Sequence, residues 1–464
     1  MALNLSRASA LGVALGLSAA ALLRPWPVSA NGRYLQSGPM VGYSEPKEVL
    51  LWVQTNAPAR VKFAYWDETN TSDRHETAEK ATLKQEAFVA KLVADEVEPG
   101  RRYAYELLIN GERVERPYPL RFQAKPALRF FRGPGAPAAG PTAAPTLRIA
   151  TGSCFYANDP ADPQGWNPGA EYPIFEAIRE KKPDLMMWLG DNLYTRDIDW
   201  TTRTGMIQRY SFSRAVKELQ PLLGSVHNYA IWDDHDYGPN DSDRSYRDKD
   251  MAREVFQLFW GNPSYGVEQS RGITSRFAWA DVEFFLLDNR WNRSPNLRSA
   301  GKRQILGEPQ IEWLLDSLAS SGATFKFIVV GGQVLNPARV AETYANYPEE
   351  QQELIRRIGE ERVRGVFFLT GDRHFTDLSK LDRKGSYPLY DFTVSPLTVS
   401  PSNGEREPNT LRVPGSYVQE RNFATIEVSG PFGSRQLTLT VWSSRGEQKW
   451  SRVITQRELR DPDE

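Results

Sequence analysis

Short apolar runs alternate with longer segments of helical periodicity between residues 147 and 370, and this alternation constrains the fold more than any other feature of the sequence. The apolar runs have the length of buried strands and occupy residues 147–150, 185–189, 229–232, 282–287, 325–330 and 366–370. The segments between them predict helices at residues 172–181, 208–223, 250–260, 309–320 and 349–362. Because strands that alternate with helices form a sheet covered on both faces, we expect an α/β fold here.

The chain before this region has a different pattern. Alternating or aromatic runs between turn residues predict strands at residues 49–53, 60–66, 86–93, 103–109 and 120–123. This spacing indicates an all-β sandwich of about 90 residues, which we place in residues 31–132. Residues 133–146 are rich in Pro, Ala and Gly, can bury almost nothing, and predict a linker.

The second domain is expected to take up residues 147–464. Strand-like runs return near its end, at residues 424–428 and 437–442. They predict either further strands of the same domain or a small terminal sheet.

Residues 1–30 have the pattern of a signal peptide. Arg7 precedes an apolar run over residues 8–23, and residues 28–30, Val-Ser-Ala, fit a small-residue cleavage site. The run is shorter than the roughly 20 apolar residues of a membrane span. We therefore expect export to the periplasm or the medium, and an uncleaved anchor is the alternative. Contact with a membrane is expected only through this segment, if it is not removed.

The charge of the chain argues against one class of partner. The formal net charge is −1 and no basic block occurs, so we expect no stable complex with nucleic acid. The chain also contains 13 Trp and 19 Tyr, which supply enough apolar area for a folded core.

Polar residues that can bind metals follow the ends of several apolar runs, in segments 152–154, 190–194, 233–236 and 371–374. Functional sites of α/β sheets form at these carboxyl ends of the strands. The segments offer a thiol, carboxylates and an imidazole, which are common metal ligands. Each alone is compatible with a plain turn, but the carboxylates of residues 233–236 repel one another unless a cation or strong donors compensate them. Together they predict a metal site.

The spacing of these residues supports a shared site. Asp191 and Tyr194 are three residues apart and share a face of a helical turn. Asp372 and His374 are two apart and share a face of an extended loop.

These motifs resemble those of a known enzyme family. Gly190-Asp-x-x-Tyr194 matches a block of purple acid phosphatases and the wider calcineurin-like metallophosphoesterases. Asp234-His235 stands where that superfamily has Asn-His, and Gly371-Asp-Arg-His374 where it has Gly-His-x-His. With Gly-Ser-Cys154 included, the chain resembles the PhoD-type alkaline phosphatases from about residue 147 to residue 374, and the resemblance extends to the β-sandwich in front.

The resemblance implies a four-layer α/β/β/α metallophosphoesterase sandwich, preceded by a small all-β domain of the fibronectin or immunoglobulin type. It implies that Cys154, Asp191 and Tyr194 surround a ferric ion, with Asp191 as a bridging ligand. It further implies that the metal cluster, whose other ions in this family are calcium, is completed by Asp234, Asp372 and His374. Other divalent metals stay open as alternatives.

The chain departs from the superfamily after residues 325–330. An additional His ligand is expected there, but the sequence reads Gly-Gly-Gln-Val, and Gln333 is a substitute candidate. This departure favours the hard-cation site of the PhoD type over the histidine-rich site with two metals.

The expected function is an exported metal-dependent phosphoesterase that hydrolyses small or polymeric phosphate esters with a metal-bound hydroxide as nucleophile. His235 is expected to contact the phosphate and to assist departure of the alcohol. Asn192 and Arg373 are expected to hydrogen-bond the phosphate, although a structural role for either stays open.

Two competing functions and one further segment remain open at this point. The same metal cluster could serve a phosphodiesterase, or the protein could be an extracellular binding module with a structural metal site. In the segment 287–293 we expect an Asp288–Arg290 pair that fastens loops, and a phosphate clamp is the alternative.

Overall fold

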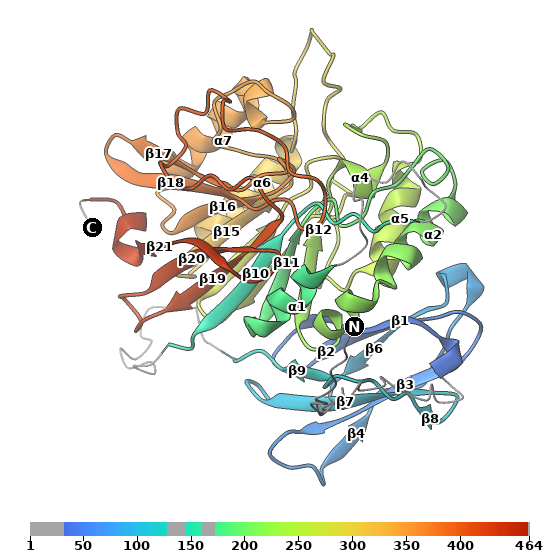
Figure 1. The fold of residues 1–464 in the computed structure, drawn as a ribbon. Helices are drawn as coiled ribbons and strands as arrows, with labels where there is room; N and C mark the ends of the chain where they lie inside the picture. The colour runs from blue at the N-terminus through green and yellow to red at the C-terminus, as the bar shows by residue number, and fades with distance from the viewer. Residues whose placement is uncertain (1–31, 128–143, 160–171, 463–464) are drawn as a thin grey trace, which may run out of the picture.

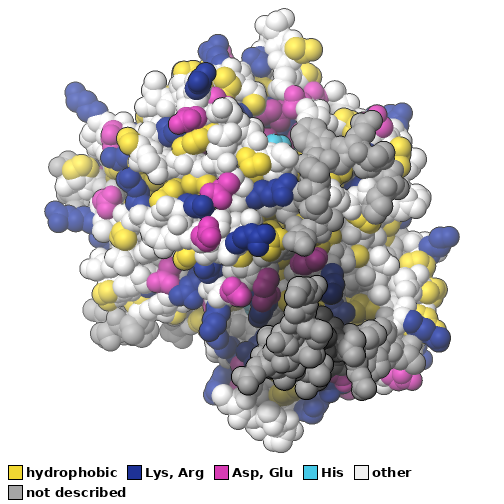
Figure 2. Space-filling model, viewed as in Figure 1, with side chains coloured by type: hydrophobic (Ala, Val, Ile, Leu, Met, Phe, Trp, Pro, Cys, Tyr) yellow, Lys and Arg dark blue, Asp and Glu magenta, His cyan; other side chains and the backbone are white. Residues whose placement is uncertain are grey.

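A computed structural model of the protein describes residues 32–127, 144–159 and 172–462. The predicted signal peptide and most of the predicted linker lie outside these residues. No helix in the described ranges combines the length and the apolar character needed to cross a membrane. On the face seen in Figure 2, acidic and basic side chains are interspersed.

The N-terminal part of the chain is all β, apart from short 3-10 turns. Its strands are β1 (Leu35–Ser44), β2 (Val49–Thr55), β3 (Arg60–Asp67), β4 (Arg74–Glu76), β5 (Lys80–Ala81), β6 (Val89–Ala94), β7 (Arg102–Ile109), β8 (Glu112–Arg113) and β9 (Arg121–Gln123). In β7, alternate residues are buried, and they pack with the inward residues of β3 into one apolar cluster. This period of two is what one buried sheet face requires.

The rest of the chain alternates strands and helices before it ends in strands (Figure 1). Its strands are β10 (Leu147–Gly152), β11 (Leu185–Leu189), β12 (His227–Ile231), β13 (Ser275–Trp279), β14 (Val282–Leu286), β15 (Phe325–Val330), β16 (Val366–Thr370), β17 (Asp377–Arg383), β18 (Ser386–Thr393), β19 (Asn422–Ser429), β20 (Gln436–Ser443) and β21 (Gln448–Thr455). Its helices are α1 (Pro173–Glu180), α2 (Arg203–Arg214), α3 (Gln220–Leu223), α4 (Asp234–Tyr237), α5 (Lys249–Phe259), α6 (Glu308–Ser320) and α7 (Pro348–Glu360).

Two large sheets pack face to face and carry helices on their outer sides, which confirms the predicted fold class (Figure 1). One has nine strands in the order β21-β20-β19-β10-β11-β12-β1-β2-β6, and the other has six in the order β13-β14-β15-β16-β18-β17. Between them, the ring of Tyr229 stacks on that of Phe277 with the centroids 3.7 Å apart. The C-terminal strands join the nine-stranded sheet through β19, which pairs with β10, so they extend the domain instead of forming a terminal sheet of their own.

Two of the elements that differ from the sequence predictions are the 208–223 helix and strand β1. The single helix predicted over residues 208–223 is divided into α2, a 3-10 turn and α3. Pro221 lies in α3, and in one continuous helix its ring would remove a backbone hydrogen bond and clash with the preceding turn. Strand β1 was not predicted, because Gly38, Pro39 and Gly42 interrupt the alternation of its residues.

Strand β1 links the two parts of the protein. It pairs antiparallel with β2 and parallel with β12, with Val41 opposite His227. Strands of the N-terminal part therefore continue the nine-stranded sheet.

His227 joins three segments at this junction. Its Nδ1 donates to the carbonyl of Gly42 at 2.9 Å, and its Nε2 accepts from the backbone N–H of Gln123 at 3.0 Å. Burial lowers the pKa of His227 to about 4. Protonation of Nε2 would also remove the acceptor that Gln123 uses.

The free energy of unfolding should therefore depend on pH through His227. The pKa of His227 in the unfolded chain is about 6.5. Between pH 6.5 and pH 4 the unfolded state therefore binds more protons than the folded state. The stability that neutral His227 contributes above pH 6.5 is lost as the pH falls through this window. The loss amounts to roughly 3 kcal/mol at most. Urea unfolding at several pH values should show a shallower dependence for His227→Asn than for the wild type, and parallel curves would contradict this.

Candidate metal centre

The polar segments predicted from the sequence converge at the carboxyl ends of β10, β11, β12 and β16. The first three strands are parallel neighbours, so their ends share one edge of the nine-stranded sheet. The segments also contact one another directly: the backbone N–H of Cys154 donates to the carbonyl of Gly190 at 3.3 Å, and the N–H of His235 donates to Asp191 Oδ1 at 3.3 Å.

Two glycines allow the segments to approach this closely. Gly190 has a φ of +93°, and a Cβ there would lie 2.7 Å from the Cβ of Asp233. A Cβ on Gly371 would lie 2.7 Å from the Cβ of Ser153 on the neighbouring segment. Close packing therefore requires a glycine before Asp191 and before Asp372. At Gly190 the positive φ requires glycine as well.

Four of the predicted site residues have left-handed backbones. The φ angles are 62° at Cys154, 48° at Asp191, 71° at Asp372 and 55° at His374. Such a conformation costs a non-glycine residue roughly 1 kcal/mol or more, and these conformations cluster where function requires an unusual side-chain direction. The strain lies at the strand ends that carry the predicted metal ligands.

The structure brings one set of predicted ligands together around Asp191. Ligand atoms of Cys154, Asp191 and His374 lie within 4.8 Å of one another. The Tyr194 hydroxyl lies 3.3 Å from Asp191 Oδ2 and 3.2 Å from His374 Nε2. A thiol, a carboxylate, a phenol and an imidazole thus converge, with His374 beside the residues expected around a ferric ion.

A second group shares Asp191 with the first. Ligand atoms of Asp191, Asp234 and His235 also lie within 4.8 Å of one another. The position of Asp191 between the two groups is what a bridging ligand needs. The carbonyl of Asp372 lies 3.7 Å from Cys154 Sγ, but its carboxylate belongs to none of the tight groups found among the described residues.

Burial makes the negative charges of this cluster unfavourable. It raises the pKa of Asp191 well above its usual range, and the nearby charge of Asp234 raises it further. Burial also raises the pKa values of the Cys154 thiol and the Asp372 carboxyl well above their ordinary values. For Asp234, burial acts in the same direction, but the charges of His235 and Arg290 outweigh it and hold its pKa below the usual range.

The donor set fits bound cations. Asn192 Oδ1, Asp233 Oδ2 and Asp234 Oδ1 are buried acceptors without a hydrogen-bond partner in the part of the chain that the structure describes. Buried oxygens of this kind normally have partners, and a cation would supply one while stabilising the ionised carboxylates. The thiol and phenol suit a transition metal such as ferric iron, and the carboxylates suit calcium.

The three residues that were expected to contact phosphate have surroundings that differ from one another. His235 is 9% exposed, its ring centroid lies 4.2 Å from that of Tyr194, and its Nδ1 has no partner among the described residues. Asn192 uses both amide hydrogens, at 2.7 Å to the carbonyl of Ile231 and at 3.0 Å to Asp236 Oδ1, which favours the structural role.

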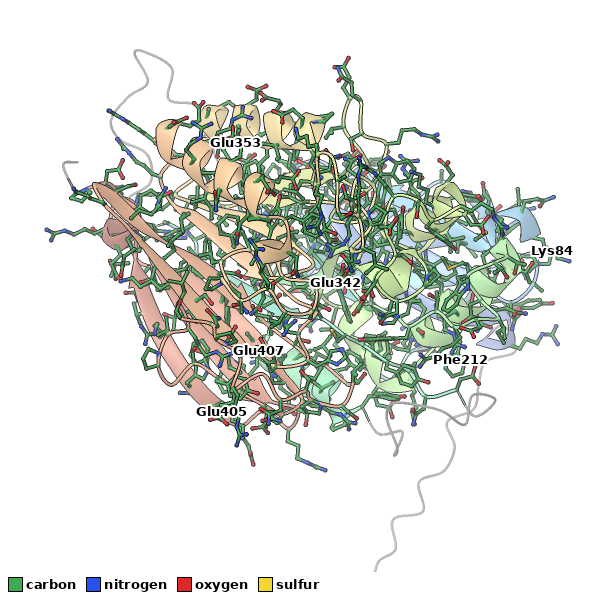
Figure 3. All side chains as sticks on the ribbon, turned by 90° about the horizontal axis from the view of Figure 1, so that it is seen from above. Lys84, Phe212, Glu342, Glu353, Glu405 and Glu407 are labelled. Carbon is green, nitrogen blue, oxygen red and sulfur yellow. The ribbon has the colours of Figure 1, made fainter. Side chains whose placement is uncertain are left out.

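Arg373 lies between the ligand loop and a later loop. One of its terminal nitrogens pairs with Glu407, while its Nε is buried without a partner within the described residues. Figure 3 shows Glu405 and Glu407 in this later loop.

Sequence reasoning missed a buried network beside the second group. Arg290 is completely buried, and its guanidinium pairs with Asp233 and Glu342 and lies 3.5 Å from Asp234 Oδ1. Arg293 adds a contact of 2.7 Å to Glu342. Glu342 lies in the loop after β15, near the centre of the molecule in Figure 3.

Two sequence interpretations change with this network. Asp288 contacts Arg290 through the backbone N–H of that residue, at 2.9 Å, while the guanidinium binds other carboxylates. Gln333, the substitute candidate for the missing ligand, donates instead to Asp377 Oδ1 at 3.0 Å and to Thr393 Oγ1 at 2.9 Å. The departure from the superfamily pattern pointed to the loop after β15, and Glu342 is the residue of that loop that reaches the centre.

Family models match both parts of the chain. A family model described as "PhoD-like phosphatase" matches residues 161–427, and a "Domain of unknown function (DUF7800)" matches residues 33–127. Alkaline phosphatase D of Bacillus subtilis (strain 168) is 22% identical over 259 residues, which cover 45% of this chain and 44% of the relative. The chain thus matches less than half the length of that curated relative.

Two solved structures share the fold. One is described as the structure of PhoD and is similar with a TM-score of 0.72 at 16% identity, covering 91% of this chain and 92% of that one. The other is a purple acid phosphatase, PPD1, from yellow lupin (Lupinus luteus) seeds, with a TM-score of 0.66 at 12% identity over 92% of this chain and 75% of that one.

Proposed function

Because the chain belongs to the PhoD-like phosphatase family, we propose that it is an exported, metal-dependent phosphoesterase that hydrolyses small or polymeric phosphate esters. The observation that carries the proposal is the convergence of Cys154, Asp191, Tyr194 and His374, with Asp234 beside them. Export is proposed from the pattern of residues 1–30. In the same proposal, residues 147–464 form the catalytic domain, residues 31–132 an accessory β domain, and residues 133–146 the connection.

We assign the residues of the centre by their chemistry. Cys154, Asp191 and Tyr194 are the proposed ligands of a ferric ion. The proposed cluster is completed by Asp234, Asp372 and His374, with calcium as the other metal. Bound cations would lower the pKa of a coordinated water to supply a hydroxide nucleophile, and would neutralise charge on the phosphate oxygens.

The remaining roles belong to the protein's own side chains. His235 faces the centre with an unpartnered Nδ1 and is proposed to give a proton to the departing alkoxide. Arg373 is proposed to bind a phosphate oxygen through its unpartnered Nε. Asn192 holds Asp236 and the end of β12, so we assign it a positioning role.

The test measures hydrolysis and metal content on the same preparations. The purified protein should hydrolyse an aryl phosphate monoester, lose this activity with a chelator and regain it with iron and calcium. His235→Asn should keep its metals and lose turnover on the order of 10²-fold, because the contribution of a positioned acid is lost. If metal content and turnover fell together, His235 would be a ligand, and hydrolysis that resists chelation would contradict the metal-dependent mechanism.

The same assay separates the proposal from its alternatives. A higher rate on an aryl diester than on the monoester would indicate a phosphodiesterase. Bound metal without hydrolysis of either ester would favour a binding module with a structural metal site.

A further inference from the structure

Ser395 is a buried residue beside the candidate metal centre that the sequence motifs do not include. Its Oγ lies 3.2 Å from Cys154 Sγ and 3.0 Å from the backbone nitrogen of His374. The residue is completely buried and follows β18, far from both partners in the sequence. One hydroxyl therefore touches two of the proposed metal-ligating residues.

The direction of these hydrogen bonds follows from the chemistry of the partners. The backbone N–H of His374 can only donate, so Ser395 Oγ accepts from it. The hydroxyl hydrogen of Ser395 is then free to point elsewhere, and the sulfur lies within its reach. Ser395 therefore donates to Cys154 Sγ.

Three other polar atoms near the sulfur give it no hydrogen. Asp191 Oδ2 lies 3.6 Å away and the carbonyl of Asp372 lies 3.7 Å away, and neither is a donor when the carboxylate is ionised. Ser153 Oγ lies 3.4 Å away, but it donates its hydrogen to the carbonyl of Val394 at 2.9 Å. The Tyr194 hydroxyl also hydrogen-bonds the sulfur, but as a proposed iron ligand it would be a phenolate without a hydrogen to give. In the proposed centre, the hydroxyl of Ser395 is thus a side-chain donor that stays directed at the sulfur.

Ser395 is itself held in place by two further residues. Its backbone N–H donates to Thr376 Oγ1 at 3.1 Å, and its carbonyl accepts from Asn422 Nδ2 at 2.7 Å. Thr376 and Asn422 are buried and contact each other at 2.6 Å. The hydroxyl therefore has a fixed position before any ion binds.

We infer that Ser395 is a positioning residue that tunes the electron donation of the Cys154 sulfur and fixes His374 relative to it. The inference rests on the proposed function, in which Cys154 and Tyr194 bind ferric iron. A hydrogen bond to a ligating sulfur withdraws electron density from it, and outer contacts of this kind adjust the properties of metal centres. Removal of the bond should make the sulfur a stronger donor and lower the energy of sulfur-to-iron charge transfer.

The test compares visible absorption spectra of iron-loaded proteins at equal iron content. Ser395→Ala should keep its iron, and its charge-transfer band should move to longer wavelength than in the wild type. Ser395→Cys keeps a weak donor and should give an intermediate position. Ser153→Ala is the matched control: it removes a neighbouring hydroxyl whose hydrogen is directed away from the sulfur, so its band should stay in place.

The outcomes separate this inference from the proposed function. An iron-loaded wild type without a visible band, or an unchanged band in Cys154→Ala, would contradict the ligand assignment itself. A normal wild-type band that does not move in Ser395→Ala would overturn the role of Ser395 alone. Loss of iron from Ser395→Ala at unchanged thermal stability would also overturn it, because the hydroxyl would then be needed for binding and not for tuning.

Discussion

The Asp191→Asn substitution is expected to remove phosphoester hydrolysis almost completely and to lower the metal content of the protein. Asp191 is the residue shared by the two groups of ligand atoms, so its substitution weakens both at once. The loss of turnover should be on the order of 10³-fold or more, the scale seen when an enzyme loses a main source of charge stabilisation. Elemental analysis and an aryl phosphate assay on the same Asp191→Asn preparation measure both effects.

A control substitution tests whether the effect comes from the position of Asp191 in the centre or from the loss of one negative charge. Asp316 is exposed on α6, and Asp316→Asn makes the same chemical change outside the centre, so it should leave metals and turnover unaltered. Chelated wild type should behave like Asp191→Asn. Full metal content and activity in Asp191→Asn would show that the reaction centre is elsewhere in the chain.

Removal of the Arg290 guanidinium is the second change with a large expected effect. Arg290 is surrounded by Asp233, Asp234 and Glu342, and all four side chains are buried. Although burial disfavours the charge of Glu342, the neighbouring Arg290 holds the pKa of Glu342 below its usual range. Arg290→Met keeps similar bulk but leaves the carboxylates uncompensated, so the free energy of unfolding should fall by about 3 to 5 kcal/mol.

Urea unfolding of metal-saturated protein measures this change, and a second substitution identifies its cause. Arg290→Met combined with Glu342→Gln should recover part of the lost stability, because one uncompensated charge is gone. Arg356→Met, which removes an arginine from an exposed pair on α7, should show no measurable change. Equal stability of Arg290→Met and the wild type would contradict a compensating role for Arg290.

The strands that carry the candidate centre could be predicted because they are buried on both faces. The runs at 185–189, 325–330 and 366–370 are apolar except for Lys326 and Thr370, and the corresponding strands have every residue buried. The sequence therefore predicts where these strands end, and with the strand ends the positions of Asp191 and Asp372. The apolar periodicity of residues 208–223 predicts one helix, but Pro221 is incompatible with the interior of a continuous helix and the segment is divided.

The buried residues that surround the proposed ligands could not be placed by the same reasoning. Arg290, Glu342 and Ser395 lie in connecting segments, where the sequence has no period that indicates a direction for the side chain. Their contacts join residues far apart in the chain, such as Arg290 with Asp233 and Ser395 with Cys154. Only the tertiary fold brings them together. The left-handed backbone at Asp191 and His374 is likewise invisible in a sequence of ordinary residues.

The parallel pairing of β1 with β12 affects whether the protein can be divided into separate fragments. A cut between the two parts would not release two independent bodies, because it would separate β1 from β12 within one sheet. A fragment starting at Leu147 would carry the bare edge of β12, next to the strand that leads to Asp191, into solution. Such an edge is a template for pairing with other chains. The N-terminal strands thus cover the edge of the sheet beside β12 and protect it from such pairing.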